Sequence, residues 1–387
     1  MSYRPSSMEE TYRGALVPNT IVAVGEASTA VPGTVIHHVP AETVRYVGCP
    51  SIVVLPSGSY VASHSYFGSG STNSDSYVYR SDDRGTSWRR IAEINGQIWS
   101  KLFLHAGAPY IVGTDHCDRS GGRLNGKMVI RRSDDEGHTW TKADSAATGL
   151  LSDQDGYHTA PTAVTVHNGR IWKGFEFAPE PDRRTWRVFV ISADVDADLL
   201  DRASWRFTSQ MDTWDDYQWI EGNMVVTPEG GLIDILRSND QRKKGSHGVD
   251  EPAALVHVSS DGTTLTHDAV ADRVDFPGGG AKFTVKRDAE TGRYFALVNP
   301  QEGPDLFRNV LALSTSDDLR RWRVVRELLS HPDPVAHAFQ YVDWEFDGDD
   351  IVFVSRTAYD DDATGAHRAH DANYATFHRI AGFRDAR

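Results

Sequence analysis

A short motif that occurs twice constrains the fold of this chain more than any other feature. Residues 81–88 read SDDRGTSW, residues 133–140 read SDDEGHTW, and both fit Ser-x-Asp-x-Gly-x-x-Trp. In such a turn the Asp accepts backbone N–H groups, the Gly adopts a positive φ, and the Trp packs against a neighbouring sheet. The motif therefore predicts repeated β-hairpins. We expect the carboxylates of the two copies to be structural: Asp82, Asp83, Asp134 and Asp135.

Weaker copies of the motif begin at Ser259 and Ser314, and a copy with an insertion ends at Trp205. Between the copies, strand–turn–strand patterns recur at a spacing of roughly 50 to 60 residues. These patterns start at Ser51, Ser100, Thr162, Asn223, Lys282 and Tyr341. Two hairpins per unit make a four-stranded sheet, the blade of a β-propeller. The sequence therefore predicts an all-β chain forming a single β-propeller of six blades.

The two ends of the chain are expected to close the ring. Residues 17–47 contain a strand-forming stretch that either supplies closing strands or forms part of a seventh blade, and residues 370–383 supply the last strand. Residues 1–16 are expected to form a loosely ordered arm. Because no linker composition interrupts residues 1–387, we predict one domain.

Composition narrows the classes of partner. A net charge of −14 argues against nucleic acid, whose phosphates require a basic face. No run of 18 apolar residues suggests a membrane span, and no signal peptide is evident, so we expect a cytoplasmic protein, or a secreted one if a leader was removed. We also expect a monomer. Two cysteines, Cys49 and Cys117, are too few for a disulfide framework and are expected to be reduced thiols.

Polar residues recur where each predicted hairpin meets the channel mouth. The start of the first strand of a hairpin lies beside the end of the second, so these positions should surround one opening. The second-strand ends are His64, Thr114 with Asp115, Glu176, Arg237, Asn299 and Arg356. The first-strand starts are His158, Glu221 with Asn223, Lys282 and Gln340. The pattern predicts a polar cup that binds a ligand; a hydrated structural channel is the alternative.

The cations of this cup favour an acidic ligand. Arg237, Lys282 and Arg356 are spaced around the mouth, and a guanidinium binds a carboxylate through two parallel N–H bonds. We therefore expect an acidic oligosaccharide or polysaccharide side chain as the partner. Alternatively each arginine pairs with a neighbouring carboxylate, for example Arg237 with Glu221. No metal-binding motif occurs, so no metal or other cofactor is required, although the polar channel leaves room for a structural cation.

The repeated motif is the Asp-box, and the chain from about Val17 resembles the Asp-box (BNR-repeat, sialidase-like) propeller enzymes that act on carbohydrates. Three segments are most similar to L-rhamnose-α-1,4-D-glucuronate lyases and propeller α-L-rhamnosidases: residues 61–68 (VASHSYFG), 354–361 (VSRTAYDD) and 370–380 (HDANYATFHRI). Several relatives of these enzymes have seven blades. A sialidase needs an N-terminal Arg motif, three arginines, and a tyrosine nucleophile paired with a glutamate. Tyr3-Arg4-Pro5 is a poor match to that Arg motif.

The resemblance implies β-elimination at a uronic acid. His64 would act as base or acid, Tyr157 or His158 would carry the second proton, and Arg237 or Arg356 would neutralise the carboxylate. Further substrate contacts would come from Lys282, Asp115, His116, Glu176, Glu221, Asn223, Asn299, His370 and Asn373. An exo-glycosidase with Glu176, Glu221 or Asp115 in the two carboxylate roles is the first alternative, and a non-catalytic glycan-binding propeller is the second. His370 and Asn373 fit a ring-closing role equally well.

Overall fold

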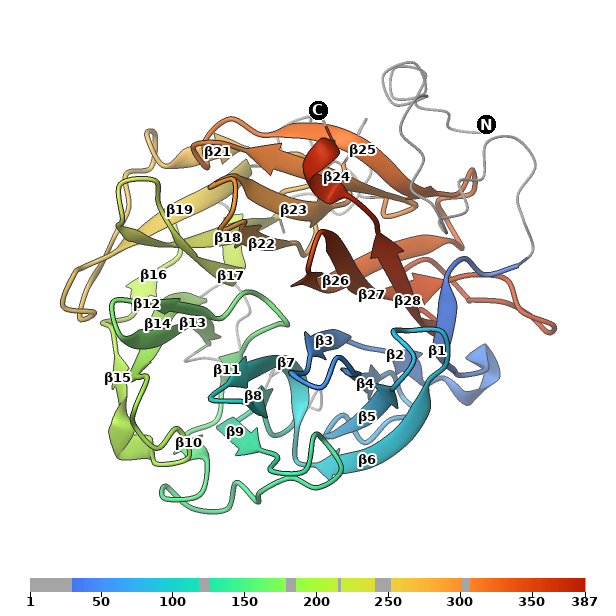
Figure 1. Ribbon diagram of the computed structural model, residues 1–387, viewed down its shortest axis with the longest axis horizontal. Helices are drawn as coiled ribbons and strands as arrows, with labels where there is room; N and C mark the ends of the chain where they lie inside the picture. The colour runs from blue at the N-terminus through green and yellow to red at the C-terminus, as the bar shows by residue number, and fades with distance from the viewer. Residues whose placement is uncertain are drawn as a thin grey trace.

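The computed structural model describes residues 30–117, 126–178, 186–214, 217–240, 252–300 and 307–386. Across these residues, six antiparallel sheets are arranged in a ring around a common axis (Figure 1). Each sheet runs outward from a strand near the axis, so each is one blade. The predicted six-bladed, all-β propeller is confirmed.

The blades follow one another along the chain, and the strands of each blade are named from the axis outward. The first contains β2 (Tyr46–Val47) and β3 (Ser51–Val54), then β4 (Tyr60–Phe67), β5 (Asp75–Ser81) and β6 (Arg89–Asn95). The second contains β7 (Ile98–His105), β8 (Ala108–Thr114), β9 (Met128–Arg132) and β10 (Leu150–Ser152). The third contains β11 (Tyr157–His158) and β12 (Thr165–His167), then β13 (Arg170–Phe177), β14 (Arg187–Asp194), β15 (Trp205–Phe207) and β16 (Met211–Asp212).

The remaining three blades have the same order. The fourth contains β17 (Tyr217–Val226), β18 (Leu232–Asp240), β19 (Pro252–Val258), β20 (Leu265–Thr266) and β21 (Arg273–Asp275). The fifth contains β22 (Thr284–Arg287), β23 (Tyr294–Val298), β24 (Val310–Ser316) and β25 (Arg323–Ser330). The sixth contains β26 (Ala338–Asp347), β27 (Asp350–Ala358), β28 (Tyr374–Ile380) and β1 (Thr34–His38). Three short 3₁₀ turns accompany the described strands: Ala41–Thr43, Arg202–Ser204 and Phe383–Asp385.

The ring is closed by strands from the two ends of the described chain. β1 pairs antiparallel with β28 as the outermost strand of the sixth blade, with Thr34 opposite Phe377 and His38 opposite Tyr374. The N-terminal stretch therefore supplies a closing strand, as one of the two expectations had it, and adds no seventh blade among the described residues. The predicted arm over 1–16 lies outside the described residues.

The Asp-box turns connect the third and fourth strands of their blades. Asp83 accepts hydrogen bonds from the Ser87 backbone N–H at 2.9 Å and from the Ser81 hydroxyl at 2.8 Å. Hydrogen bonds from Ser87 and Ser81 hold the pKa of Asp83 at about 2. Gly85 has a φ of 92°, where an added Cβ would meet the Phe377 ring of the sixth blade. The carboxylate therefore fixes the turn, as predicted.

Three inner strands carry a β-bulge at the same place. The register shifts lie between Ile98 and Lys101 in β7, between Ile220 and Asn223 in β17, and between Gln340 and Asp343 in β26. The first bulged residue of each strand has a positive φ: 53° at Trp99, 58° at Glu221 and 53° at Tyr341. A bulge re-aims a side chain, and a positive φ is costly for a residue with a Cβ. Alternate blades thus turn one large side chain each toward the axis.

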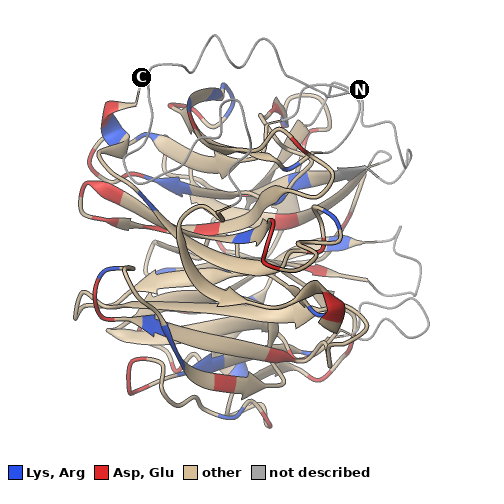
Figure 2. Ribbon diagram, turned by 90° about the vertical axis from the view of Figure 1, so that its right-hand side faces the viewer, with Lys and Arg blue, Asp and Glu red and all other residues tan. Residues whose placement is uncertain are grey.

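Charged residues of both signs are interspersed over the strands and loops seen from the side of the ring (Figure 2). The described part of the chain on that side therefore carries no continuous basic stripe. None of the helical turns found within the described ranges is long and apolar enough to cross a membrane.

Candidate functional site

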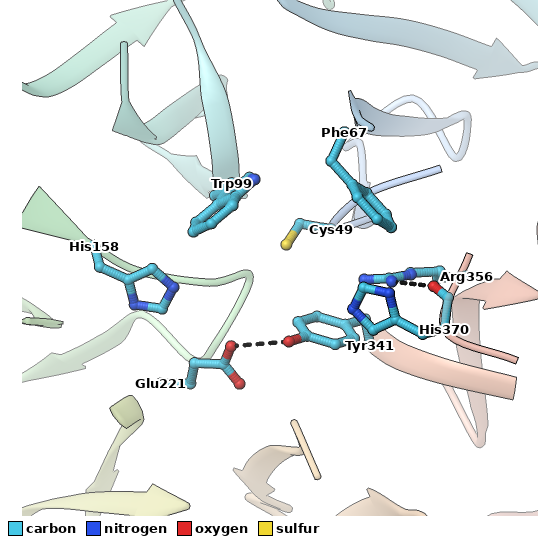
Figure 3. Close-up of a pocket in the computed structure, with 9 residues that line it drawn as sticks. Cys49, Phe67, Trp99, His158, Glu221, Tyr341, Arg356 and His370 are labelled. Atoms are coloured by element: carbon cyan, nitrogen blue, oxygen red, sulfur yellow. Dashed lines mark hydrogen bonds between the residues drawn. The ribbon is translucent and has the colours of Figure 1, made fainter. Parts of the chain in front are cut away.

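The three bulges open onto a pocket at one end of the axis (Figure 3). Its volume is about 80 Å³, and its lining comes from five blades: Gly48, Cys49, Phe67, Trp99, His158, Glu221, Tyr341, Arg356 and His370. One ordered water needs at least about 10–15 Å³ on this measure. The pocket therefore holds several waters or much of one sugar ring, but not a chain of sugars.

Tyr341 and Glu221 form a hydrogen-bonded pair in this pocket. The Tyr341 hydroxyl donates to Oε1 of Glu221 at 3.3 Å, and Oε2 of Glu221 lies 2.8 Å from Nη1 of Arg237. Arg237 stands opposite Ile220 in the register of β17 and β18, so it reaches the bulge from the neighbouring strand. Burial, and then the charge of Glu221, raise the pKa of Tyr341. The phenol is therefore protonated and hydrogen-bonded to a carboxylate that can accept its proton.

Three guanidinium groups surround the Tyr341 ring. Their central carbons lie 5.9 Å (Arg237), 5.5 Å (Arg308) and 4.8 Å (Arg356) from the ring centroid. Arg308 donates to Oε1 of Gln340 at 2.5 Å. The predicted pairing of Arg237 with Glu221 is present, and it leaves Arg237 committed within the protein.

Arg356 is placed differently. It lines the pocket, lies 4.4 Å from the Phe67 ring centroid and donates to the backbone carbonyl of His370. Within the part of the chain that the structure describes, it forms no ion pair with a carboxylate. Burial lowers the pKa of Arg356 to about 10. A buried cation without a counter-ion, facing a pocket, is suited to bind an anion.

His158 lies on another wall of the pocket and is held by Glu176. Its Nδ1 lies 2.7 Å from Oε2 of Glu176, and its ring is edge-on to Trp99 with centroids 5.0 Å apart. The other oxygen of Glu176 accepts the backbone N–H of Glu221 at 2.7 Å. Glu176 is fully buried. The predicted site residues His158, Glu176, Glu221, Arg237, Arg356 and His370 are therefore brought together in or directly behind one pocket.

His64 is not part of this group. It is 1% exposed, and its ring nitrogens lie 3.2 Å from the Tyr79 hydroxyl and 3.1 Å from the Ser65 carbonyl. Burial lowers the pKa of His64 to about 3. Side chains alternate along a strand, so His64 faces His37 of the sixth blade, whereas Phe67, three residues later, lines the pocket. The structure thus places His64 between two blades instead of at the mouth.

Tyr157, Asp115 and His116 also lie away from the pocket lining. Tyr157 packs between blades against Phe177 and Phe189, on the strand face opposite to that of His158. Asp115 and His116 bond to each other at 2.7 Å, and Asp115 accepts the Lys127 N–H at 2.7 Å.

Two predicted ligand contacts join neighbouring blades. Asn223 accepts N–H bonds from Ala163 at 3.2 Å and Val285 at 3.1 Å, which connect the third, fourth and fifth blades. Asn299 donates to the carbonyl of Val310 and to that of Phe339, both at 2.7 Å. Because their polar atoms are used by backbone groups, these amides hold the ring together.

Asn373 and Lys282 are likewise committed to the backbone. Asn373 bonds both the N–H and the carbonyl of Tyr359, at 3.1 and 3.0 Å, which fits the ring-locking alternative. Lys282 donates to the Val342 carbonyl at 2.7 Å, directly after the bulged Tyr341. Burial lowers the pKa of Lys282 to about 7.

Sequence reasoning missed several lining residues. Tyr341 was the start of a repeat but not a predicted site residue, and Cys49 and Phe67 were not predicted as site residues. Arg308, which lies on the Tyr341 ring, was also missed. One signal was present: Trp99, Glu221 and Tyr341 occupy equivalent positions in their repeats. Within the described residues, no group of three or more His, Cys, Asp or Glu side chains is arranged to hold a metal ion.

Comparison with solved structures supports the fold. No protein-family model matches the chain, and no curated protein matches it. Among solved structures, an α-L-arabinanase of Penicillium chrysogenum complexed with arabinobiose is 13% identical, covers 93% of this chain and 100% of its own, and has a TM-score of 0.55. An α-L-arabinofuranosidase of Fusarium graminearum is 11% identical over 93% and 99% of the two chains, with a TM-score of 0.59.

A Trypanosoma rangeli sialidase in complex with sialic acid is 14% identical over 95% of this chain and 57% of its own, with a TM-score of 0.57. At these identities the likeness concerns the fold alone. The expected similarity to rhamnose–glucuronate lyases and rhamnosidases finds no support among these neighbours. The chain has the propeller fold on which glycoside hydrolases with six blades are built.

Proposed function

We propose that this protein is an exo-acting glycoside hydrolase that releases a terminal acidic sugar. The observation that carries the proposal is the Tyr341 hydroxyl bound to the Glu221 carboxylate inside a pocket of about 80 Å³. The small volume supports cleavage at a chain end. The likeness to propeller glycosidases supports hydrolysis over the uronate elimination expected from the sequence.

In the proposed reaction Tyr341 is the nucleophile and Glu221 is its base. Sialidases are the known exception to carboxylate nucleophiles among glycosidases, because they use a tyrosine. A neutral phenol can approach a sugar carbon next to a carboxylate without the repulsion that a second carboxylate would meet. Arg237, 2.8 Å from Glu221, holds that carboxylate in place and balances its charge.

Arg356 is the proposed anchor for the substrate carboxylate. It faces the pocket with its guanidinium stacked between the rings of Phe67 and Tyr341, at 4.4 and 4.8 Å. This stacking fixes the plane of the guanidinium, and a fixed plane suits bidentate binding of a carboxylate. Arg308, on the same tyrosine ring, adds positive charge.

Two other mechanisms fit the contacts less well. Glu176 and Glu221 do not form a free pair of carboxylates, because Glu176 is buried and takes bonds from His158 and from a backbone N–H. Uronate elimination with His64 as base or acid also fits less well, because His64 lies between blades and not at the pocket.

The test is a panel of 4-methylumbelliferyl glycosides of sialic acid, glucuronic acid and their neutral counterparts, assayed with the wild-type chain and with Tyr341→Phe. We expect release of the fluorophore from an acidic glycoside only, and its loss in the variant. Ultraviolet absorbance of an unsaturated uronate would identify elimination instead. Binding of the glycosides without any release would identify a lectin and refute the proposal.

A further inference from the structure

One buried carboxylate connects the two walls of the pocket. Glu176 bonds His158 through Oε2 and the bulged backbone of Glu221 through Oε1, each at 2.7 Å. We infer that His158 is the general acid and base of the reaction, and that Glu176 is a positioning residue which orients His158 and the Glu221 bulge together. This inference rests on the proposed function, which leaves the proton donor unassigned.

The surroundings of His158 fix its orientation. The ring lies between Trp99 and Trp186, with centroids 5.0 and 5.2 Å away. Nδ1 is turned to Glu176, so that nitrogen carries the proton shared with the carboxylate. For Nε2, no hydrogen-bond partner is found among the described residues, and the residue lines the pocket (Figure 3). A histidine held at one nitrogen by a carboxylate and open at the other is the arrangement of a proton-transfer dyad.

Glu176 is bound at both oxygens, and one of these bonds reaches the bulge of the fourth blade. The bulge at Glu221 has a positive φ and exposes its N–H toward β13. The Gly222 N–H also approaches Oε1, at 3.4 Å. The same carboxylate therefore stabilises two groups. One is the strained backbone that directs Glu221 toward Tyr341, and the other is the His158 imidazole on the adjoining wall of the pocket.

The proposed proton transfers balance over two steps. In the first, the Tyr341 oxygen bonds to the anomeric carbon and gives its proton to Glu221, while the glycosidic C–O bond breaks and the leaving oxygen takes the proton of His158 Nε2. In the second, neutral His158 removes a proton from water as the water oxygen attacks the anomeric carbon. The Tyr341–carbon bond then breaks, and the phenolate recovers its proton from Glu221.

Several charged or titratable groups lie near this dyad. The pocket that His158 lines also contains Glu221, Tyr341, Arg356, His370 and Cys49. Glu176 interacts electrostatically with Lys173, Asp234 and Arg237. Glu176 is the carboxylate in direct contact with the imidazole among the described residues, at 2.7 Å from Nδ1.

Leaving-group dependence tests the role of His158. An alkyl glycoside of the acidic sugar that wild type accepts needs a proton on its leaving oxygen, whereas a 4-nitrophenyl glycoside does not. We expect His158→Gln to lower kcat/KM, which reports on the first step, by about 10²-fold or more on the alkyl glycoside and by less than about 10-fold on the nitrophenyl glycoside. Equal losses on the two substrates would overturn the assignment of His158 as the acid.

An NMR measurement tests Glu176 without any substrate. The imidazole N–H signals are recorded for wild type and for Glu176→Gln, and the Nδ1 proton of His158 is assigned by its absence in His158→Gln. We expect a downfield signal for this proton in wild type, because it is shared with a carboxylate at 2.7 Å, and the loss or upfield shift of the signal in Glu176→Gln.

Asp288→Asn is the matched control, because Asp288, in the fifth blade, is also buried but bonds Arg384 and Thr291. It should leave the Nδ1 proton signal of His158 unchanged. An unchanged signal in folded Glu176→Gln would refute the dyad. Should Glu176→Gln fail to fold, the leaving-group comparison with His158→Gln still decides for or against the inference. An inactive wild type would refute the proposed function, whereas the NMR signal still tests the contact between Glu176 and His158.

Discussion

The Tyr341 hydroxyl lies 3.3 Å from Oε1 of Glu221, although 120 residues separate them along the chain. Each residue is the first member of a β-bulge and has a positive φ. The two side chains meet only because the fourth and sixth blades are turned toward the same axis. The closed ring, and not any local motif, therefore creates the pair.

Replacing Tyr341 by Phe removes the proposed nucleophile while keeping the ring that packs against the arginines. We expect kcat on the acidic glycoside to fall by about 10³-fold or more, with far-ultraviolet circular dichroism unchanged. Tyr294→Phe is the matched control, because its hydroxyl bonds the Val226 carbonyl at 2.8 Å, away from the pocket. A variant Tyr341→Phe that keeps most of its activity would remove Tyr341 from the mechanism.

Replacing Arg356 by Met keeps the volume between Phe67 and Tyr341 but removes the cation. We expect KM for the acidic glycoside to rise by about 10- to 100-fold, because a charge-assisted bidentate contact contributes about 1.5–3 kcal/mol. Binding of the corresponding sugar amide, measured by calorimetry, should change much less. Equal losses of affinity for the acidic sugar and for its amide would show that Arg356 does not recognise the carboxylate.

The ion pair between Lys101 and Asp343 predicts a stability effect. Nζ and Oδ2 lie 2.7 Å apart, and both side chains are buried. Although burial acts to raise it, the charge of Lys101 lowers the pKa of Asp343. Among the described residues, Asp343→Asn leaves Lys101 with the more exposed Glu345 as its counter-ion, so the free energy of unfolding in urea should fall by about 3 kcal/mol.

The surface pair Arg90–Glu93 supplies the control for that measurement. Its side chains are 53% and 38% exposed. Water screens such a pair, so Glu93→Gln should change the free energy of unfolding by less than about 0.5 kcal/mol. Similar effects for Asp343→Asn and Glu93→Gln would contradict the assigned importance of the buried pair.

Buried imidazoles predict how stability depends on pH. Burial lowers the pKa of His64, and that of His378, to about 3. The unfolded chain therefore binds these protons at a higher pH than the folded chain does. The contribution of each imidazole is complete above its unfolded pKa of about 6.5 and declines as pH falls toward 3, by about 1.4 kcal/mol per pH unit.

His378→Gln tests this dependence. The variant should lose about 2 kcal/mol less unfolding free energy than wild type between pH 7 and pH 5, as measured by urea denaturation at the two pH values. His138→Gln, at an exposed Asp-box turn, should follow the wild-type curve. A wild-type slope in His378→Gln would mean that the imidazole is accessible to protons in the folded chain.

Much of the fold was predictable because it depends on local physics. The Asp-box specifies a turn through Asp83 and Gly85, and the recurring hairpins set the number of blades. The mouth positions were also predictable in part: His158 stands opposite Glu176, and Gln340 opposite Arg356, as hairpin pairing requires.

The errors in predicting the site arise where a β-bulge, or the face of the strand on which a side chain lies, determines the direction of that side chain. His64 was predicted at the mouth from its position in the repeat, yet the two-residue alternation of β4 places it on the face toward the sixth blade. Tyr157 is displaced in the same way relative to His158. Tyr341 was overlooked because nothing in its own segment marks it as reactive.

The amino-acid sequence by itself determined the propeller and the polar character of one end of its axis, because turns, alternation and repeat length act over a few residues. Only the tertiary structure decided which polar groups meet. Bulges in alternate blades aim Trp99, Glu221 and Tyr341 into one pocket, and Glu176 connects two of its walls. These contacts join residues from different blades, so they depend on the angle at which the ring closes, which no single segment encodes.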